Sequence, residues 1–180
     1  NGRSAVAAET PIPTRPLGKS GVEVSILGLG GHHIGRIRDD NESIALTRRA
    51  IDGGVTFLDN AWEYHNGRSE ELMGRALQDG YRKKAFLMTK HHGRDKKTAM
   101  AHLEDSLRRL RTDVIDLWQF HEIVYDPDPE MIFAPDGGIE AAEAAKKQGK
   151  VRFIGYTGHR DPLLHLKMLA YGYPWDAVQM

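Results

Sequence analysis

Apolar, strand-like runs recur along the chain at intervals of roughly 30 residues, and a helix-like stretch separates each run from the next. The runs occupy 25–30, 55–59, 85–90, 115–121 and 151–157, and a last one begins at Trp175. This spacing is typical of strand–helix–strand units, in which consecutive strands are parallel. Because the runs are mostly apolar, the predicted sheet is buried on both faces. Two α/β architectures fit: an open doubly wound sheet, or part of a (β/α)8 barrel.

The glycines after the first run favour the barrel. An open dinucleotide-binding sheet carries G-x-G-x-x-G at that point, but here Gly28, Gly30 and Gly31 are followed by two histidines and Gly35. We therefore predict a (β/α)8 TIM barrel, present as roughly its first five and a half units and preceded by a short β-hairpin at 14–24. A closed barrel takes about 250 residues, so we expect the 180 residues of this chain to belong to a longer polypeptide.

The domain organisation is predicted to be simple. Residues 14–180 are expected to form the N-terminal two-thirds of one barrel domain, and residues 1–13 a flexible tail. Ala5 and Ala7 fit the small-residue pattern of a signal-peptidase site, but no apolar segment precedes them. We therefore expect a cytoplasmic protein, with export to the periplasm as the alternative.

The composition excludes several partners and chemistries. The 25 basic and 25 acidic side chains balance, so we expect neither a nucleic acid nor a membrane surface as partner. The chain has no cysteine, which excludes disulfides and thiolate chemistry. No apolar stretch approaches the ~18 residues of a membrane span. The oligomeric state stays open.

The connections are predicted to be helical, with one exception. Apolar periodicity and helix-ending signals predict helices over 41–52, 96–111, 139–148 and 161–171. A further helix is expected to begin near Ser69, a favoured N-cap residue, with Glu70 and Glu71 in its first turn. The segment 122–137 carries three prolines and is predicted to be a long functional loop.

Three of the runs end on a residue whose charge or proton is useful: Asp59, Lys90 and His121. Tyr64 follows the first of these runs. The carboxyl ends of barrel strands share one rim, where the chemistry of such folds takes place. We therefore expect these remote side chains to meet.

A tyrosine beside a lysine suggests proton donation. A nearby ammonium favours the phenolate, so Lys90 is expected to lower the pKa of Tyr64 from about 10. Asp59 would keep the lysine charged and oriented, and His121 would hydrogen-bond the substrate oxygen or the phenol. A proton donor that faces a carbonyl needs an electron source, for which a nicotinamide hydride is the natural candidate.

With these residues in place, the chain resembles the aldo-keto reductases, which are NAD(P)-dependent (β/α)8 barrels, over residues 14–180. The resemblance is carried by FLDNAWEYHNGRSEELMGRAL at 57–77, MTK at 88–90, SLRRLRTDVIDLWQFH at 106–121, PLGKSGVEVSILGLGG at 16–31 and GKVRFIGYTGH at 149–159. It implies the reversible reduction of an aldehyde or ketone to an alcohol. NADP(H) is the cofactor that the family usually takes, and NAD(H) stays open.

The resemblance also implies a role for each matched residue. Tyr64 would be the general acid, with Lys90 and His121 tuning it and Asp59 paired with the lysine. The residues implied to contact the cofactor are Gly30, Gly31, Asp59, Thr157, Gly158 and Gln179. Gly158 departs from the family, which commonly has Asn there, so one hydrogen bond to the carboxamide is missing or comes from elsewhere, such as His159. No metal ligand is expected among the site residues.

Two other functions stay open. Barrel hydrolases gather metal-binding histidines at the same rim, and here the histidines that follow strand ends are His32, His33, His91, His92, His121 and His159. No H-x-H pair lies on the first strand, and Lys90 would place a cation in the site, which argues against a hydrolase. The second alternative is a cofactor-binding regulatory subunit with little turnover. The presence of all four catalytic residue types favours an enzyme over such a subunit.

Overall fold

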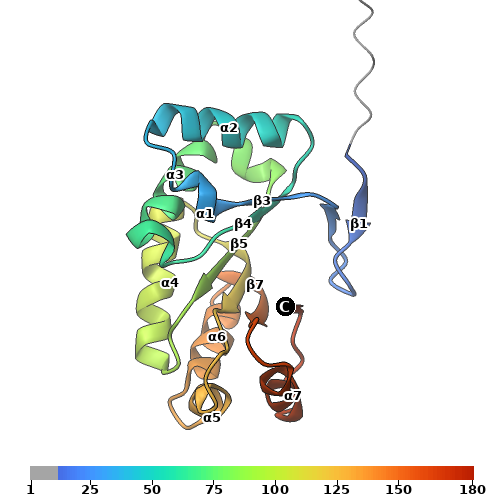
Figure 1. Ribbon diagram of the computed structural model, residues 1–180, viewed down its shortest axis with the longest axis vertical. Coiled ribbons are helices and arrows are strands. Elements are labelled where there is room, and N and C mark those ends of the chain that lie inside the picture. The colour runs from blue at the N-terminus through green and yellow to red at the C-terminus, as the bar shows by residue number, and fades with distance from the viewer. Residues whose placement is uncertain (1–11) are drawn as a thin grey trace, which may run out of the picture.

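The computed structural model describes residues 12–180 (Figure 1). Most of the predicted tail, including Ala5 and Ala7, lies outside these residues. One parallel sheet forms the centre, and its strands follow one another in sequence order. They are β3 (Gly28–Gly30), β4 (Phe57–Asp59), β5 (Phe86–His91), β6 (Ile115–Phe120), β7 (Val151–Thr157) and β8 (Ala177–Gln179). The predicted α/β class with consecutive parallel strands is confirmed.

The hairpin predicted at 14–24 forms a separate two-stranded sheet. Its strands, β1 (Thr14–Pro16) and β2 (Glu23–Ser25), pair antiparallel, and Gly18 and Gly21 in the turn adopt positive φ. The first run of the parallel sheet is therefore shorter than predicted, because Ser25 belongs to the hairpin. Its hydroxyl accepts a hydrogen bond from the Thr56 amide at 2.8 Å, which ties the hairpin to the segment that leads into β4.

Helices pack against the sheet between successive strands (Figure 1). They are α1 (Gly31–Ile34), α2 (Asp40–Asp52), α3 (Arg68–Ala76), α4 (Lys96–Leu110), α5 (Asp128–Phe133), α6 (Gly138–Lys147) and α7 (Pro162–Ala170), with 3-10 turns η1 (Tyr64–Gly67) and η2 (Tyr81–Lys84). Carboxylate caps begin three of them, since Asp39, Asp95 and Asp161 each accept a hydrogen bond from an amide of the first turn. The four helices predicted from periodicity are confirmed to within a few residues. In the described part of the chain, no helix combines the length and apolar character needed to cross a membrane.

Two local predictions are wrong. Ser69 is not the N-cap of α3: the helix follows Gly67, whose φ is +90°, and the Ser69 hydroxyl donates to the Gly31 carbonyl at 2.7 Å. The segment 122–137 is not a plain loop, because α5 lies within it. Asp128 organises this segment by accepting hydrogen bonds from the Val124 and Tyr125 amides. The first error comes from a contact between remote residues, which local sequence does not reveal.

The main core lies between the sheet and the helices. Side chains of alternate strand positions face the helices and are fully buried, among them Leu58, Leu87, Trp118 and Ile154. The helices contribute Leu103, Leu110, Ala141 and Ala145 to the same cluster. A smaller cluster on the opposite face joins the hairpin residue Val24 to Phe86, Met88 and Leu117. The central strands β5 and β6 are therefore buried on both faces, as their apolar character predicted, whereas the edge strands β3 and β8 are largely exposed.

Candidate active site

The two-residue repeat of the strands decides which side chains reach the site. Phe57, Phe86, Met88, Leu117, Phe153 and Ala177 pack on the face opposite the helices. Residues at the same parity further along each strand point to that same face, at its carboxyl end. They include Asp59, Lys90, His121, Thr157 and Gln179. One face of one rim therefore receives polar side chains from five segments, as parallel strand order requires.

The lysine and aspartate form an ion pair. Lys90 is 2 % exposed, and its ammonium contacts the Asp59 carboxylate and donates to the Asn60 carbonyl at 2.9 Å. Gln179 donates from Nε2 to the second carboxylate oxygen of Asp59 at 3.2 Å. Residues from the ends of β4, β5 and β8 are thereby linked, and the positive charge of the lysine is balanced.

The Tyr64 ring lies between the lysine and the histidine. Lys90 Nζ is 5.3 Å from the ring centroid, and the His121 ring meets the tyrosine edge-on at a centroid distance of 5.7 Å. Within residues 12–180 the Tyr64 hydroxyl makes no hydrogen bond. Its loop is held by a turn in which His65 and Asn66 adopt positive φ. The structure thus brings the four predicted catalytic residues to one place.

The pKa of Tyr64 shifts in the direction opposite to the prediction. Burial, followed by the negative charges of Asp59, Glu63 and Glu122, raises the pKa of Tyr64 to about 12. The expected lowering is absent because burial and the three carboxylates disfavour the phenolate. The phenol is therefore neutral near pH 7 and carries the proton that a donor needs.

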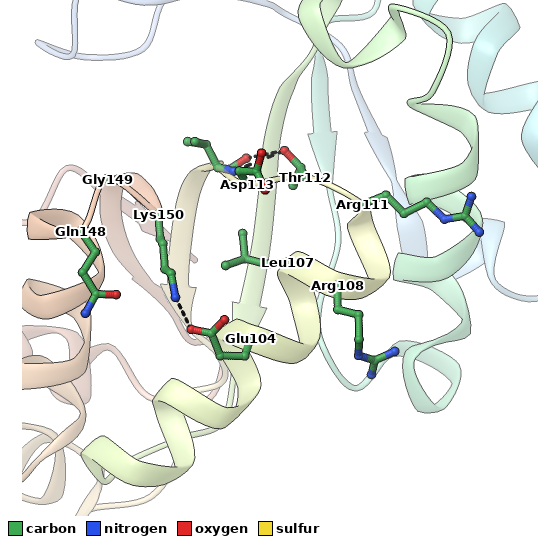
Figure 2. Close-up of a pocket in the computed structure, with 10 residues that line it drawn as sticks. Glu104, Leu107, Arg108, Arg111, Thr112, Asp113, Gln148, Gly149 and Lys150 are labelled. Atoms are coloured by element: carbon green, nitrogen blue, oxygen red, sulfur yellow. Dashed lines mark hydrogen bonds and ion pairs between the residues drawn. The ribbon is translucent and has the colours of Figure 1, made fainter.

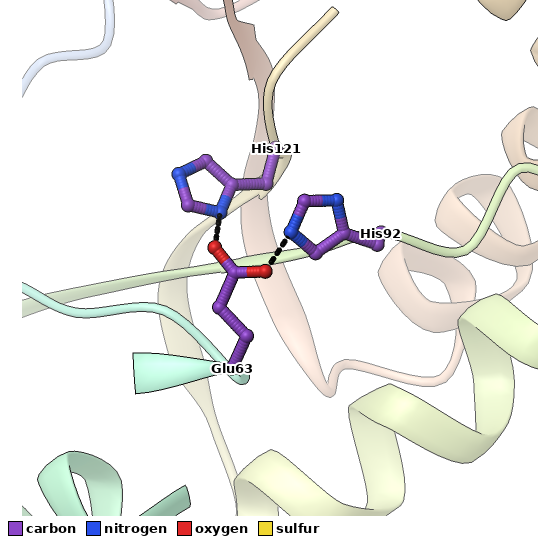
Figure 3. A group of neighbouring side chains, drawn as sticks. All are labelled: Glu63, His92 and His121. Atoms are coloured by element: carbon purple, nitrogen blue, oxygen red, sulfur yellow. Dashed lines mark ion pairs between the residues drawn. The ribbon is translucent and has the colours of Figure 1, made fainter. Parts of the chain in front are cut away.

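Glu63 is a functional candidate that the sequence reasoning missed. Its carboxylate lies between two imidazoles: Oε1 is 3.0 Å from His121 Nδ1, and Oε2 contacts His92 Nε2 (Figure 3). Burial alone would raise the pKa of Glu63, but the two histidines hold it well below its usual range. Burial lowers the pKa of His121, and Glu63 opposes this shift. The available signal was its position beside Tyr64, at the rim where His92 and His121 also emerge.

A cavity of about 280 Å³ opens onto three of the four predicted catalytic residues, Tyr64, Lys90 and His121. It is lined by Tyr64, Lys90, His121, Glu122, Thr157, Gly158, His159, Gln179 and Met180. Of the residues expected to contact a cofactor, Thr157, Gly158 and Gln179 line this cavity, whereas Gly30 and Asp59 line a neighbouring one. Gly31 lines neither of these two cavities. It is buried against Asn60, since a Cβ at Gly31 would lie 2.7 Å from the Asn60 side chain.

The glycine at 158 has a steric cause. A Cβ at this position would lie 2.8 Å from the Ile123 carbonyl oxygen and 3.0 Å from His165 Nε2. The larger side chain that the resemblance led us to look for does not fit between these atoms. His159, named above as a substitute, lines the cavity.

A larger cavity, of about 580 Å³, lies at the other end of the sheet (Figure 2). Its walls come from the end of α4 and from the segments that precede β6 and β7. Lys150 pairs with Glu104 across it. Because chemistry on parallel βα folds is placed at the carboxyl ends of the strands, this cavity is not the candidate active site.

A parallel βα sheet whose strands follow one another in sequence order, with polar side chains gathered at the carboxyl rim, is the arrangement of the (β/α)-barrel class. Within that class, the chain belongs to the aldo/keto reductase family, whose family model matches residues 26–180. The resemblance to the aldo-keto reductases that the sequence motifs indicated is confirmed.

Individual relatives agree with this assignment. The aldo-keto reductase AFTS1 of Alternaria alternata is 33% identical in an alignment 180 residues long. The alignment covers 77% of this chain and 48% of that protein. The holo form of aldo-keto reductase AKR11C1 from Bacillus halodurans superposes with a TM-score of 0.77 at 29% identity, covering 94% of this chain and 57% of that one. An aldo/keto reductase from Klebsiella pneumoniae in complex with NADP and acetate gives a TM-score of 0.69 at 30% identity, covering 81% and 50%. The chain spans about half the length of the curated relatives it matches.

Proposed function

We propose that this chain carries the proton-donating half of an NAD(P)H-dependent reductase that converts an aldehyde or ketone to an alcohol, reversibly. The observation that carries the proposal is the convergence of Tyr64, Lys90 and His121 on one cavity. Family membership supports it. The substrate is therefore expected to be a small carbonyl compound.

NADPH is the cofactor that we propose, with NADH as the alternative, because similar structures are complexes with NADP and with NADPH. The cavity fits a group that bears a carboxamide. Gln179 offers an amide and Thr157 a hydroxyl, and Gly158 lines the cavity without adding a side chain of its own. When bound, the nicotinamide supplies a hydride to the carbonyl carbon.

The protein's own part in the reaction is to hold and deliver a proton. Tyr64 is neutral and half-buried, so its hydroxyl can donate to a carbonyl oxygen in the cavity. As the proton leaves, the Lys90 ammonium near the ring stabilises the developing phenolate. Asp59 keeps this ammonium in place, and His121 at the ring edge can hydrogen-bond the substrate oxygen.

Replacement of the tyrosine tests the proposal. We expect Tyr64→Phe to lower kcat for NADPH oxidation by about 10²–10⁴-fold across a panel of aldehydes and ketones, the usual share of a general acid, while NADPH binding is kept. Tyr81→Phe is the matched control, because Tyr81 bonds Asp52 away from the site, and it should retain activity. Lys90→Met should also disable turnover. An unchanged kcat in Tyr64→Phe would refute the assignment.

The test also separates the alternatives. A regulatory subunit would quench its tryptophan fluorescence on binding NADPH yet turn over no carbonyl compound. A barrel hydrolase would bind no NADPH. One observation weakens the hydrolase reading: His91, one of the rim histidines, is fully buried and stacks on Trp118 at 3.9 Å, on the helix side of the sheet.

A further inference from the structure

Glu63, His92 and His121 emerge from three consecutive strand ends and point to one spot. Glu63 lies on the segment after β4, His92 follows β5, and His121 follows β6. One ligand atom from each lies within 4.8 Å of the other two, and Figure 3 shows both carboxylate oxygens directed at the two rings. We propose that these three side chains form a binding site for a divalent cation of the zinc class, a site that the carbonyl-reduction chemistry does not require.

The donor set is suited to such an ion. Two imidazole nitrogens and one carboxylate oxygen are a known ligand set for zinc with an open fourth position. At metal–ligand distances of about 2.0–2.2 Å, tetrahedral ligand atoms lie about 3.3–3.6 Å apart. Small side-chain rotations therefore bring the three groups into range. The chain has no cysteine, so imidazole and carboxylate are its ligands for ions of this class.

The two histidine nitrogens face Glu63. His92 Nε2 and His121 Nδ1 each lie at contact distance from a Glu63 oxygen, and within residues 12–180 neither nitrogen has a further hydrogen-bond partner. A cation between the three groups accepts both nitrogen lone pairs and neutralises the carboxylate.

The surroundings hold the ligands and do not repel an ion. The His121 backbone is fixed, because its amide donates to the His91 carbonyl at 2.8 Å and its carbonyl accepts from Arg94 at 2.8 Å. Arg94 is itself paired with Asp128 at 3.0 Å, and Lys90 with Asp59. Each nearby cation therefore has its own counterion, and the charge of Glu63 is left for the metal.

The site is open on one side and touches the proposed reaction cavity on the other. The side chains of Glu63 and His92 are 35% and 30% exposed, which gives an ion a path from solvent. His121 lines the cavity, whereas Glu63 and His92 do not. With a metal on Nδ1, a neutral His121 must carry its proton on Nε2. An ion at this site would thus fix the second nitrogen of His121 as a hydrogen-bond donor.

Metal titration tests the site. The purified protein, stripped with EDTA, is titrated with Zn²⁺ and separately with Co²⁺ by calorimetry, and Co²⁺ binding is also followed by its visible spectrum. We expect one equivalent of each, with the intense absorption of a tetrahedral cobalt centre. Glu63→Gln and His92→Asn should each weaken binding by about tenfold or more, since even indirect partners of a metal contribute about 10–100-fold.

Matched variants separate a built site from general attraction. Glu122→Gln removes a carboxylate from the same rim, and His102→Asn removes a partly buried histidine, yet neither residue belongs to the cluster. Both should bind Zn²⁺ as the unsubstituted protein does. If they weaken binding as much as Glu63→Gln and His92→Asn, or if the unsubstituted protein binds less than one equivalent, the proposal is wrong.

A second measurement covers variants that fold poorly. Zn²⁺ should raise the Tm of the unsubstituted protein, because it binds only the folded state, and should leave the Tm of His92→Asn unchanged. The absence of any rise in the unsubstituted protein overturns the proposal. Neither measurement depends on turnover, so a failed reductase assay and a failed metal titration are distinguishable.

Discussion

Glu63 and Glu70 lie close in sequence but on opposite sides of the same sheet. Glu70, on α3, is fully buried. Its Oε1 accepts from the Thr89 hydroxyl at 2.7 Å, and its Oε2 lies 3.4 Å from Arg109. Glu63 is 35% exposed, and its carboxylate faces His121 Nδ1 at 3.0 Å and His92 Nε2. Thr89 precedes Lys90 on β5, and side chains alternate along a strand. Thr89, the partner of Glu70, therefore points toward the helices, whereas Lys90 points toward the rim.

The comparison teaches that burial alone does not mark a functional carboxylate. Burial raises the pKa of Glu70, and its hydrogen bonds with Thr89 and Arg109 only partly offset this. Burial also acts on Glu63, but His121 and His92 outweigh it and hold the pKa of Glu63 low. A carboxylate with satisfied partners supports the fold. A carboxylate that lies beside two imidazoles and is reachable from solvent is available for chemistry.

The largest loss in the free energy of unfolding is expected from removing the buried carboxylate of Glu70. Glu70→Ala leaves Arg109 and Thr89 without their buried partner, and breaking a buried pair in this way costs about 3–5 kcal/mol. Urea unfolding measures the loss. Glu71→Ala is the matched control, because Glu71 is the adjacent glutamate and is exposed, and it should change stability by less than about 0.5 kcal/mol. Equal effects in the two variants would show that Glu70 is not structural.

Much of this arrangement could be predicted from sequence, because it follows from repeating local patterns. Asp59, Lys90 and His121 each end an apolar run, and the runs recur at a regular interval. The meeting of these residues at one rim could therefore be predicted from the spacing of the runs. The caps at Asp39 and Asp161 are likewise local, since each binds its own first turn.

The remaining features depend on contacts between remote residues. Ser69 has the local features of an N-cap, yet its hydroxyl bonds Gly31, so tertiary structure overrides the local preference. The sequence neighbours of Glu63 did not indicate a function for it, because His92 and His121 contact it only in the folded chain. The predicted direction of the Tyr64 pKa shift was wrong for the same reason: the sequence shows a lysine nearby but not the burial and the carboxylates that surround the phenol in the folded chain.

A smaller effect is expected in the pH dependence of stability. The pKa of Glu70 in the folded protein lies above its unfolded value of 4.5, so the folded state binds more protons between these two values. The stability linked to this group is present below pH 4.5 and is lost as the pH rises through the folded-state pKa, by about 1.4 kcal/mol per unit of difference.

Glu70→Gln removes this titration and keeps an acceptor for Thr89. Unfolding free energies from urea melts at several pH values, between about pH 4 and pH 7, should therefore fall more steeply with rising pH in the unsubstituted protein than in Glu70→Gln. Parallel curves would mean that Glu70 keeps an ordinary pKa, and that the contrast with Glu63 does not arise from burial.

The smallest effect on stability is expected at the carboxylate proposed to act in chemistry. Glu63→Gln, measured in EDTA, should change the free energy of unfolding by only about 0–1 kcal/mol, because Glu63 is partly exposed and such ion pairs contribute little. The same substitution should nevertheless weaken Zn²⁺ binding by about tenfold or more. A loss of stability close to that of Glu70→Ala would place Glu63 among the groups that hold the fold together. A small loss of stability combined with a large loss of metal binding is the pattern of a residue kept for a ligand, because its partners gain from the ion more than the fold gains from the pair.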